Sequence, residues 1–243
     1  MIGLVLAAGP GRRLHPLTAT LPKTLLPLTD GRTILDRALA NLRSVGIDNV
    51  AIVTGFAAAR VRERVDELER RHGVRLELLF NDRAEEWNNA YSLWLARDAF
   101  REGALLLNGD TVHPASVETT LLEARGPGVL LAVDGEKPLG EEEMKVVLSD
   151  DGALRRISKH VEPGTADGEY IGLAVIEPTA AGPLAEALEA TWRRDPSLYY
   201  EDGFQELVDR GGDVHAASIG TVDWVEVDDH EDLALARTME CRY

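Results

Sequence analysis

The first half of the chain alternates between runs rich in apolar residues and segments with helical spacing. The apolar runs predict buried strands and fall at residues 2–6, 50–53, 74–79 and 104–107. The segments between them space apolar side chains three and four positions apart, which predicts helices at residues 33–45, 57–72 and 89–100. Strands that alternate with helices favour a doubly wound α/β sheet, and such sheets bind ligands beyond the carboxyl ends of their strands.

The second half is richer in strands and turns. Its predicted strands lie at residues 129–133, 144–148, 154–158, 170–176, 214–219 and 223–227. Its predicted helices lie at residues 183–190, at residues 202–210 and from Asp229 onward. No linker rich in proline, glycine or serine separates the two halves. We therefore expect one domain, residues 1–243, in which a small strand-rich region within residues 126–243 covers a substrate held by residues 1–125.

The net charge narrows the range of partners. The 243 residues include 26 Lys and Arg against 42 Asp and Glu, a formal charge of −16. A strongly negative surface repels nucleic acids and anionic membranes, so neither is expected as a partner. No apolar run approaches the ~20 residues that span a bilayer, and the single cysteine, Cys241, cannot form an internal disulfide. These features favour a cytoplasmic protein.

Small residues and glycines follow the first predicted strand. The segment comprises Leu6, Ala7, Ala8, Gly9, Pro10 and Gly11. Glycines allow backbone amides to approach a phosphate closely, and small alanines leave room for a flat base. The segment lacks the third glycine of a dinucleotide-binding fingerprint, and the chain contains no Walker-type glycine–lysine loop. Up to residue 29 the only charged side chains are Arg12, Arg13 and Lys23, which predicts a positive pocket for a small polyanion.

Two groups of carboxylates supply the opposite charge. Asp110 follows the predicted strand at 104–107, where a ligand of an α/β sheet is expected. Near the end of the chain, Glu226 and Asp228 alternate with valines, so that in a strand both acids project from one face. Carboxylate oxygens suit Mg²⁺, and a cation relieves the repulsion between neighbouring acids. We assign Asp228 to the metal and Asp229 to the cap of the final helix.

Residues 6–28 resemble the signature of the nucleotidylyltransferase (pyrophosphorylase) superfamily. The likeness runs through Leu-Ala-Ala-Gly-x-Gly-x-Arg-Leu, Pro-Leu-Thr and Pro-Lys-x-Leu-Leu-Pro. It implies a Rossmann-like doubly wound mixed sheet with a small strand-rich subdomain, and a Mg²⁺-dependent transferase that releases pyrophosphate. It also implies that a nucleoside triphosphate is contacted by Leu6, Ala7, Ala8, Gly9, Gly11, Arg12, Arg13 and Lys23. Arg13 and Lys23 would contact phosphates as catalytic residues, while Asp110 and an acid near the end of the chain, Glu226 or Asp228 or both, would bind the metal.

Two further segments, residues 86–92 and 224–228, resemble the CTP-dependent cytidylyltransferases that act on phosphocholine, inositol phosphate or small alkylphosphonates. This likeness implies that CTP is the donor and that Asn89 and Ala90, together with Ala8, contact its cytidine part. The other substrate would then be a small phosphorylated or phosphonate acceptor. The reaction would transfer CMP to that acceptor.

Fewer residues of the sequence indicate where the acceptor binds. The same likeness implies that Lys145, as a catalytic residue, and Lys159 face the phosphoryl group of the acceptor. Lys145 could instead be an edge-strand lysine that prevents aggregation. Tyr200 and Glu201 belong to a cluster of aromatic and acidic residues before a predicted helix, which could hold an ammonium group of the acceptor or could simply be packing.

The sequence alone leaves two other functions open. One is a sugar-1-phosphate nucleotidylyltransferase that uses dTTP, UTP or GTP, and the other is a non-catalytic domain that senses nucleotides. The second requires loss of the lysine or of the metal-binding acids, and both Lys23 and Asp110 are present. A homodimer is also possible.

Overall fold

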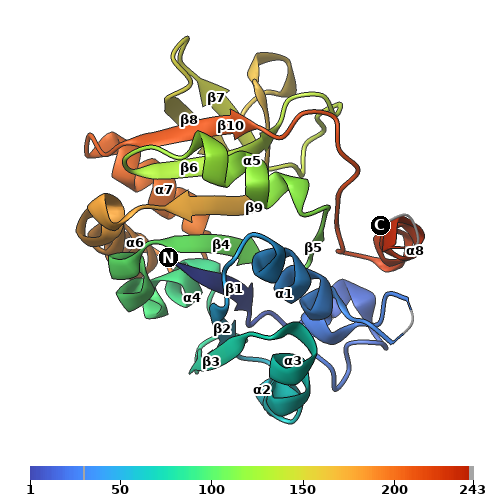
Figure 1. Cartoon of the computed structure of the whole chain (residues 1–243). Coiled ribbons are helices and arrows are strands. Elements are labelled where there is room, and N and C mark those ends of the chain that lie inside the picture. Colours follow the sequence, from blue (N-terminus) through green and yellow to red (C-terminus); the bar gives the residue numbers. More distant parts are fainter. Residues whose placement is uncertain (30, 241–243) are drawn as a thin grey trace.

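The structure, a computed structural model, describes residues 1–29 and 31–240, so that Cys241 lies outside the described residues. Nine strands of the described residues form one mixed sheet (Figure 1). Seven of them follow the order β10-β6-β9-β4-β1-β2-β3, and β7 joins β9 to β8 beside this path. Two further strands, β5 and β11, pair with each other in a separate antiparallel ribbon. The expected α/β fold is confirmed.

The seven strands of the main path are β1 (Ile2–Ala7), β2 (Asn49–Thr54), β3 (Arg75–Phe80), β4 (Ala104–Asn108), β6 (Val129–Asp134), β9 (Gly168–Ile176) and β10 (Val214–Ser218). The four remaining strands are β5 (Thr111–Val112), β7 (Lys145–Leu148), β8 (Leu154–Ser158) and β11 (Val225–Glu226). Most of the β1 backbone is buried between helices, and it pairs in parallel with β2 and β4. This burial on both faces accounts for the continuous apolar run at the start of the chain.

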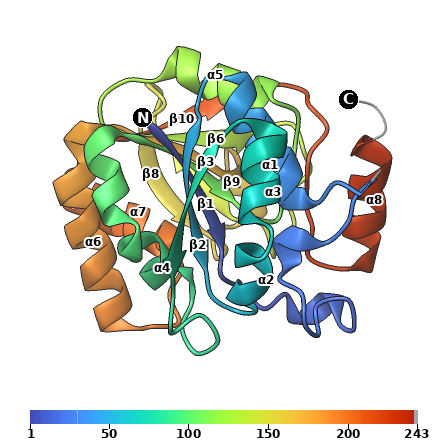
Figure 2. The ribbon, with the colours of Figure 1, turned by 60° about the horizontal axis from the view of Figure 1, so that its bottom comes forward.

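The described residues form α-helices that, apart from α8, cover both faces of the sheet (Figure 2). They are α1 (Ile34–Ser44), α2 (Ala58–Arg62), α3 (Val65–His72), α4 (Asn89–Leu95), α5 (Ser116–Ala124), α6 (Ala181–Arg194), α7 (Tyr200–Asp209) and α8 (His230–Glu240). Helices α1, α3 and α5 share one apolar cluster with the sheet, and α4, α6 and α7 share the other. Among the described residues, no helix has both the length and the apolar character needed to cross a bilayer.

The last helix packs away from the sheet, on a third apolar cluster of its own. The cluster contains Leu233 and Met239 of α8, together with Leu14 and Leu26 from near the beginning of the sequence. Val225 of the β5–β11 ribbon completes the contact. Residues near the beginning of the chain are thereby packed against α8 and the β5–β11 ribbon, which brings the basic segment of the sequence close to the acidic one.

Some details of the fold differ from the sequence-based expectation. The helix expected at 57–72 is interrupted after Arg62. Near this break, the guanidinium of Arg64 forms ion pairs with Glu67 and Asp36. The helix expected at 89–100 ends at Leu95 and continues as a 3-10 helix. Helix α5 was not expected. The mixed sheet, in contrast, agrees with what the family resemblance implies, since strand β9 runs antiparallel to both β4 and β6.

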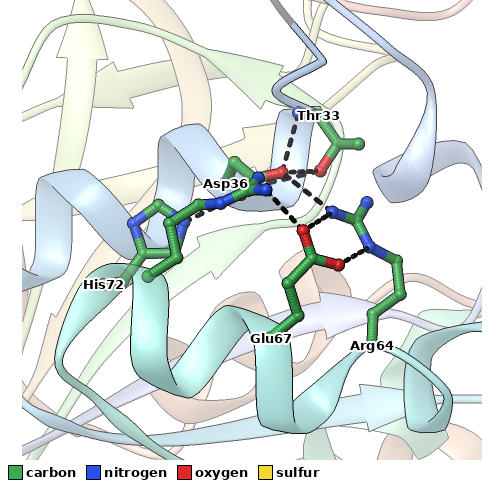
Figure 3. A network of polar contacts seen from close by, with 6 residues as sticks. Thr33, Asp36, Arg64, Glu67 and His72 are labelled. Atoms are coloured by element: carbon green, nitrogen blue, oxygen red, sulfur yellow. Dashed lines mark hydrogen bonds and ion pairs between the residues drawn. The ribbon is translucent and has the colours of Figure 1, made fainter.

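A buried carboxylate joins α1 to α3 (Figure 3). Asp36 accepts hydrogen bonds from the backbone and hydroxyl of Thr33 at 2.9 and 2.7 Å, which caps α1. It also pairs with Arg71 at 2.9 Å and with His72 at 2.8 Å. Burial alone would raise the pKa of Asp36, but the hydrogen bonds from His72, Thr33 and Arg71 outweigh it and hold the pKa well below the usual 3.8.

The Asp36→Asn variant is expected to lose about 3 kcal/mol of unfolding free energy near neutral pH, because it removes one partner of a buried charge network. Since the pKa of Asp36 is lowered, its stabilisation is present above pH 3.8 and is lost as the pH falls below that value. The difference between the two proteins should therefore shrink in acid. Urea unfolding at about pH 7 and about pH 3 measures it.

The matched control is Glu67→Gln, which removes an exposed member of the same network and should cost much less. A difference between wild type and Asp36→Asn that stays constant with pH would contradict the assigned role.

Candidate active site

The glycine-rich segment turns sharply where β1 ends. Gly11 adopts a left-handed conformation with φ of 58°, and a Cβ at that position would lie 3.2 Å from the Cβ of Lys23. Thr18 fixes the turn by donating its hydroxyl to the carbonyl of Gly11 at 2.8 Å. The turn carries Arg12 and Arg13 on a single 3-10 turn and brings Lys23 beside it. A glycine is needed here because an L side chain would be strained and would crowd the lysine.

Lys23 lies between two carboxylates from distant parts of the chain. Its Nζ is 2.6 Å from Oδ2 of Asp110 and 2.8 Å from Oδ1 of Asp228. The other oxygen of Asp228 accepts a hydrogen bond from Arg13. Burial opposes the charge of Lys23, but the two aspartates outweigh it and raise its pKa. Burial likewise opposes ionisation of Asp228, but Lys23 and Arg13 lower its pKa below the usual value.

The β5–β11 ribbon sets the positions of the acids. Asp110 lies in the turn between β4 and β5, and its carbonyl accepts a hydrogen bond from the amide of Val227 at 2.9 Å. Glu226 pairs with Thr111 across the ribbon. Asp110, Glu226 and Asp228 each offer an oxygen within 4.8 Å of the others. The predicted convergence of the two acidic segments is therefore present in the structure.

The electrostatics of the three carboxylates fit a divalent cation. Crowding by protein atoms raises the pKa of Glu226 to about 8, and the negative charges of Asp110 and Asp228 add to the rise. A cation between the three would relieve this repulsion, and an all-oxygen set suits Mg²⁺. Asp229 does not join them, because its Oδ1 accepts hydrogen bonds from the amides of Glu231 and Asp232 and so caps α8. The prediction that Asp229 is a helix cap is confirmed.

A first cavity of about 370 Å³ opens beside the glycine-rich segment. The walls include Ala8, Gly9 and Arg12 from that segment and Asn89 from the start of α4. Ser197 closes it from a loop more than a hundred residues away in sequence. Asn88 holds this loop by donating its side-chain amide to the carbonyl of Ser197 at 2.9 Å. The small residues Ala8 and Gly9 on one wall leave room for a flat group such as a base.

The remaining predicted contacts lie around this cavity or behind it. Leu6 and Ala7 belong to β1, and the carbonyl of Leu6 accepts the amide of Gly109 at 2.8 Å. A Cβ at Gly109 would lie 2.5 Å from that carbonyl, so the strands can approach only because this residue is glycine. Ala90 is fully buried in α4. These three residues, Leu6, Ala7 and Ala90, are not among the residues that line the cavity, although Ala7 and Ala90 are next in sequence to Ala8 and Asn89, which do.

A second cavity of about 820 Å³ lies between β7, β8 and the start of α7. Lys159, Tyr199 and Glu201 are among its lining residues. The ammonium of Lys159 lies 5.4 Å from the ring centre of Tyr199. Burial raises the pKa of Glu201 to about 8, and within residues 1–29 and 31–240 its buried Oε2 has no hydrogen-bond partner. The negative charge of Glu201 contributes to the raised pKa of Glu226.

The structure places Tyr200 away from the position expected for an acceptor contact. Its side chain is fully buried and donates a hydrogen bond to Oδ1 of Asn108 at 2.9 Å. Its backbone amide donates to Oδ1 of Asn89 at 2.9 Å. Tyr200 thus joins the helix beside the first cavity to the strand that leads to Asp110, and Tyr199 faces the second cavity in its place.

Lys145 is also placed differently from the expectation. It lines the second cavity, but its Nζ donates to the carbonyls of Gly140, Glu141 and Glu143 at 3.0, 2.9 and 3.1 Å. A fully buried ammonium needs such partners, and the loop at 140–143 supplies them. The edge-strand alternative is wrong, because β7 pairs with β8 on one side and with β9 on the other at this residue.

Sequence reasoning missed Ser197 and Asn108. Ser197 is recruited from a remote loop, and no local pattern marks it. Asn108 was visible as the last residue before Gly109 and Asp110, at the carboxyl end of a central strand, where ligand-binding residues are expected.

Comparisons with known proteins identify the family of this chain. The family model for nucleotidyl transferases matches residues 2–174. The bifunctional IPC transferase and DIPP synthase of Aquifex aeolicus is 28% identical over 235 residues, which are 96% of this chain and 50% of that protein. The CMP-5'-(3-aminopropyl)phosphonate synthase of Streptomyces rubellomurinus is 32% identical over 241 residues, 94% of this chain and 37% of that protein. The chain thus spans half or less of the length of these curated relatives.

The fold has a close counterpart among solved structures. The inositol-1-phosphate CTP transferase from T. maritima superimposes with a TM-score of 0.83 at 22% identity. The superposition covers 98% of this chain and 94% of that one. At this identity the likeness establishes the shared fold.

Proposed function

Because the chain belongs to the nucleotidyl transferase family, we propose that it transfers CMP from CTP to a small phosphorylated or phosphonate acceptor and releases pyrophosphate. The observation that carries the proposal is the meeting of Arg13 and Lys23 with Asp110, Glu226 and Asp228 beside the glycine-rich turn. Such a group of cations and metal-binding acids suits the neutralisation and positioning of a triphosphate. It is the machinery that phosphoryl-group transfer requires, because that chemistry depends on bringing mutually repelling anions together.

The reaction needs no strong general base. An anionic oxygen of the acceptor attacks the α-phosphorus of CTP in line, and a new P–O bond forms. The bond from the α-phosphorus to the bridging oxygen breaks, and its electron pair leaves with pyrophosphate. Arg13, Lys23 and the backbone amides near Gly11 donate hydrogen bonds to the phosphates and hold them in the reactive geometry. When bound to Asp110, Glu226 and Asp228, Mg²⁺ supplies further positive charge at the phosphates.

The choice of CTP is supported by the relatives' names, two of which refer to CTP or CMP. The first cavity is assigned to cytidine, with Ala8 and Asn89 in its wall. The second cavity is assigned to the acceptor. The unpartnered oxygen of Glu201 beside the ring of Tyr199 suits an acceptor whose other end carries an ammonium group. Lys159 is assigned to the phosphoryl end of the same molecule.

A panel of substrates tests the proposal by pyrophosphate release. CTP, UTP, dTTP and GTP are each combined with phosphocholine, 2-aminoethylphosphonate, inositol 1-phosphate and glucose 1-phosphate. We expect turnover with CTP and an ammonium-bearing acceptor. Glu201→Gln should lower kcat/KM for that acceptor by about tenfold, because it removes a charge-assisted contact, and should affect an uncharged acceptor less.

Two results would contradict the proposal. Turnover confined to a sugar 1-phosphate with UTP, dTTP or GTP would identify the sugar nucleotide alternative. Binding of CTP without pyrophosphate release from any acceptor would favour a nucleotide sensor.

A further inference from the structure

The ammonium of Lys23 occupies the space between two of the three clustered acids. It contacts Oδ2 of Asp110 at 2.6 Å and Oδ1 of Asp228 at 2.8 Å. Only 14% of the Lys23 side chain is exposed, so that the ammonium is held in one place by its surroundings. The lysine is therefore already a cation within the candidate metal site.

A metal ion at these oxygens and the ammonium of Lys23 compete for the same two carboxylates. Mg²⁺ lies roughly 2.0–2.1 Å from its oxygen ligands. An ion that bridges the two oxygens now bound by Lys23 would therefore lie next to its Nζ, which is 2.6 and 2.8 Å from the same oxygens. Two positive centres so close together repel each other strongly in a partly buried site. The ammonium of Lys23 therefore opposes the binding of an ion at these oxygens.

The second oxygen of Asp228 is also engaged. Arg13 donates a hydrogen bond to Oδ2 of Asp228, while Lys23 binds Oδ1. The two cationic side chains assigned to the phosphates are thus paired with the acids assigned to the metal. A triphosphate offers both cations new anionic partners, and their transfer to it would leave the carboxylate oxygens open.

We propose that Lys23 is an internal cation that keeps a divalent metal ion from bridging Asp110 and Asp228 until a polyphosphate draws its ammonium away. The inference rests on the proposed function only for the identity of that polyphosphate. Lys23 then has two sequential partners, first the acids and then the phosphates. Binding of metal and of nucleotide is positively coupled, and by thermodynamic linkage each raises the affinity for the other.

The test measures Mn²⁺ binding without any nucleotide, by electron paramagnetic resonance of the free ion. Lys23→Met keeps an unbranched side chain that is one atom shorter and removes the charge. This variant should bind Mn²⁺ at least about tenfold more tightly than the wild type, because the acids lose their internal cation. The matched control is Arg12→Met, which removes the same charge from the same segment at the wall of the first cavity.

If Lys23→Met does not fold, Lys23→Gln replaces it with the same expected gain. Equal Mn²⁺ affinities in the wild type and the Lys23 variant would overturn the inference, as would an equal gain in Arg12→Met. The result is independent of the proposed function, because no nucleotide is present. A protein that shows the gain but does not use CTP contradicts the function alone, and an active protein without the gain contradicts this inference alone.

Discussion

CMP transfer by the Lys23→Met variant is expected to be about a thousandfold slower than by the wild type, judged by kcat/KM with CTP. Lys23 is the least exposed cation of the site, with 14% of its side chain accessible against 67% for Arg13. Charge stabilisation is most effective where water is excluded, so removing this ammonium should cost more than removing Arg13. Steady-state pyrophosphate release at saturating Mg²⁺ measures the effect.

The same variant separates two properties that usually change together. It should bind the metal more tightly and yet turn over more slowly, because its acids are unmasked while the phosphates lose a partner. Circular dichroism and thermal unfolding show whether the variant is folded. A folded Lys23→Met protein with a near-normal rate would remove this lysine from the catalytic machinery.

The second large effect is expected for Asp228→Asn, which should lower kcat by about a thousandfold. The substitution preserves shape but removes a negative charge from the candidate metal site. It takes away the charged partner of Arg13 and one of the two charged partners of Lys23, which keeps Asp110. The loss should be accompanied by a higher Mg²⁺ concentration for half-maximal activity. A Mg²⁺ titration of pyrophosphate release measures both quantities.

The adjacent residue provides a matched control. Asp229→Asn makes the same substitution at the next residue, where the asparagine oxygen can still cap α8. Its activity and its Mg²⁺ requirement should stay close to those of the wild type. Equal losses in the two variants would show that the charge of the segment, rather than the position of Asp228, matters.

Most strands and helices of the first half could be predicted because the apolar residues that each one buries follow a regular spacing in the sequence. The direction of β9 could not be predicted, since all nine of its residues are buried and an antiparallel strand buried on both faces has the same pattern as a parallel one. The interruption of the helix at residues 57–72 was also hidden, because Val61, Val65 and Leu68 keep helical spacing across it. Interactions with a distant carboxylate, Asp36, accompany the break.

The charged half of the site was predictable for a different reason. Glycines beside basic residues indicate an anion site, and acids that follow a strand indicate a cation site, without knowledge of the three-dimensional path of the chain. The acceptor side depends on which way a side chain turns. Tyr200 turns inward to Asn108, its neighbour Tyr199 turns to the cavity, and the ammonium of Lys145 is bound by its own loop. The packing of the folded protein determines these side-chain orientations, and the spacing of residues in the sequence does not predict them.

The apolar cluster beneath α8 has a consequence for protein synthesis. Leu14 and Leu26 flank the basic residues at the start of the chain, and they pack against Val225 and Leu233. A ribosome releases the amino-terminal strands first. The nascent polypeptide therefore carries its basic segment without Glu226 and Asp228 until translation has passed residue 228, and the cluster beneath α8 can be completed only after Met239 has been added.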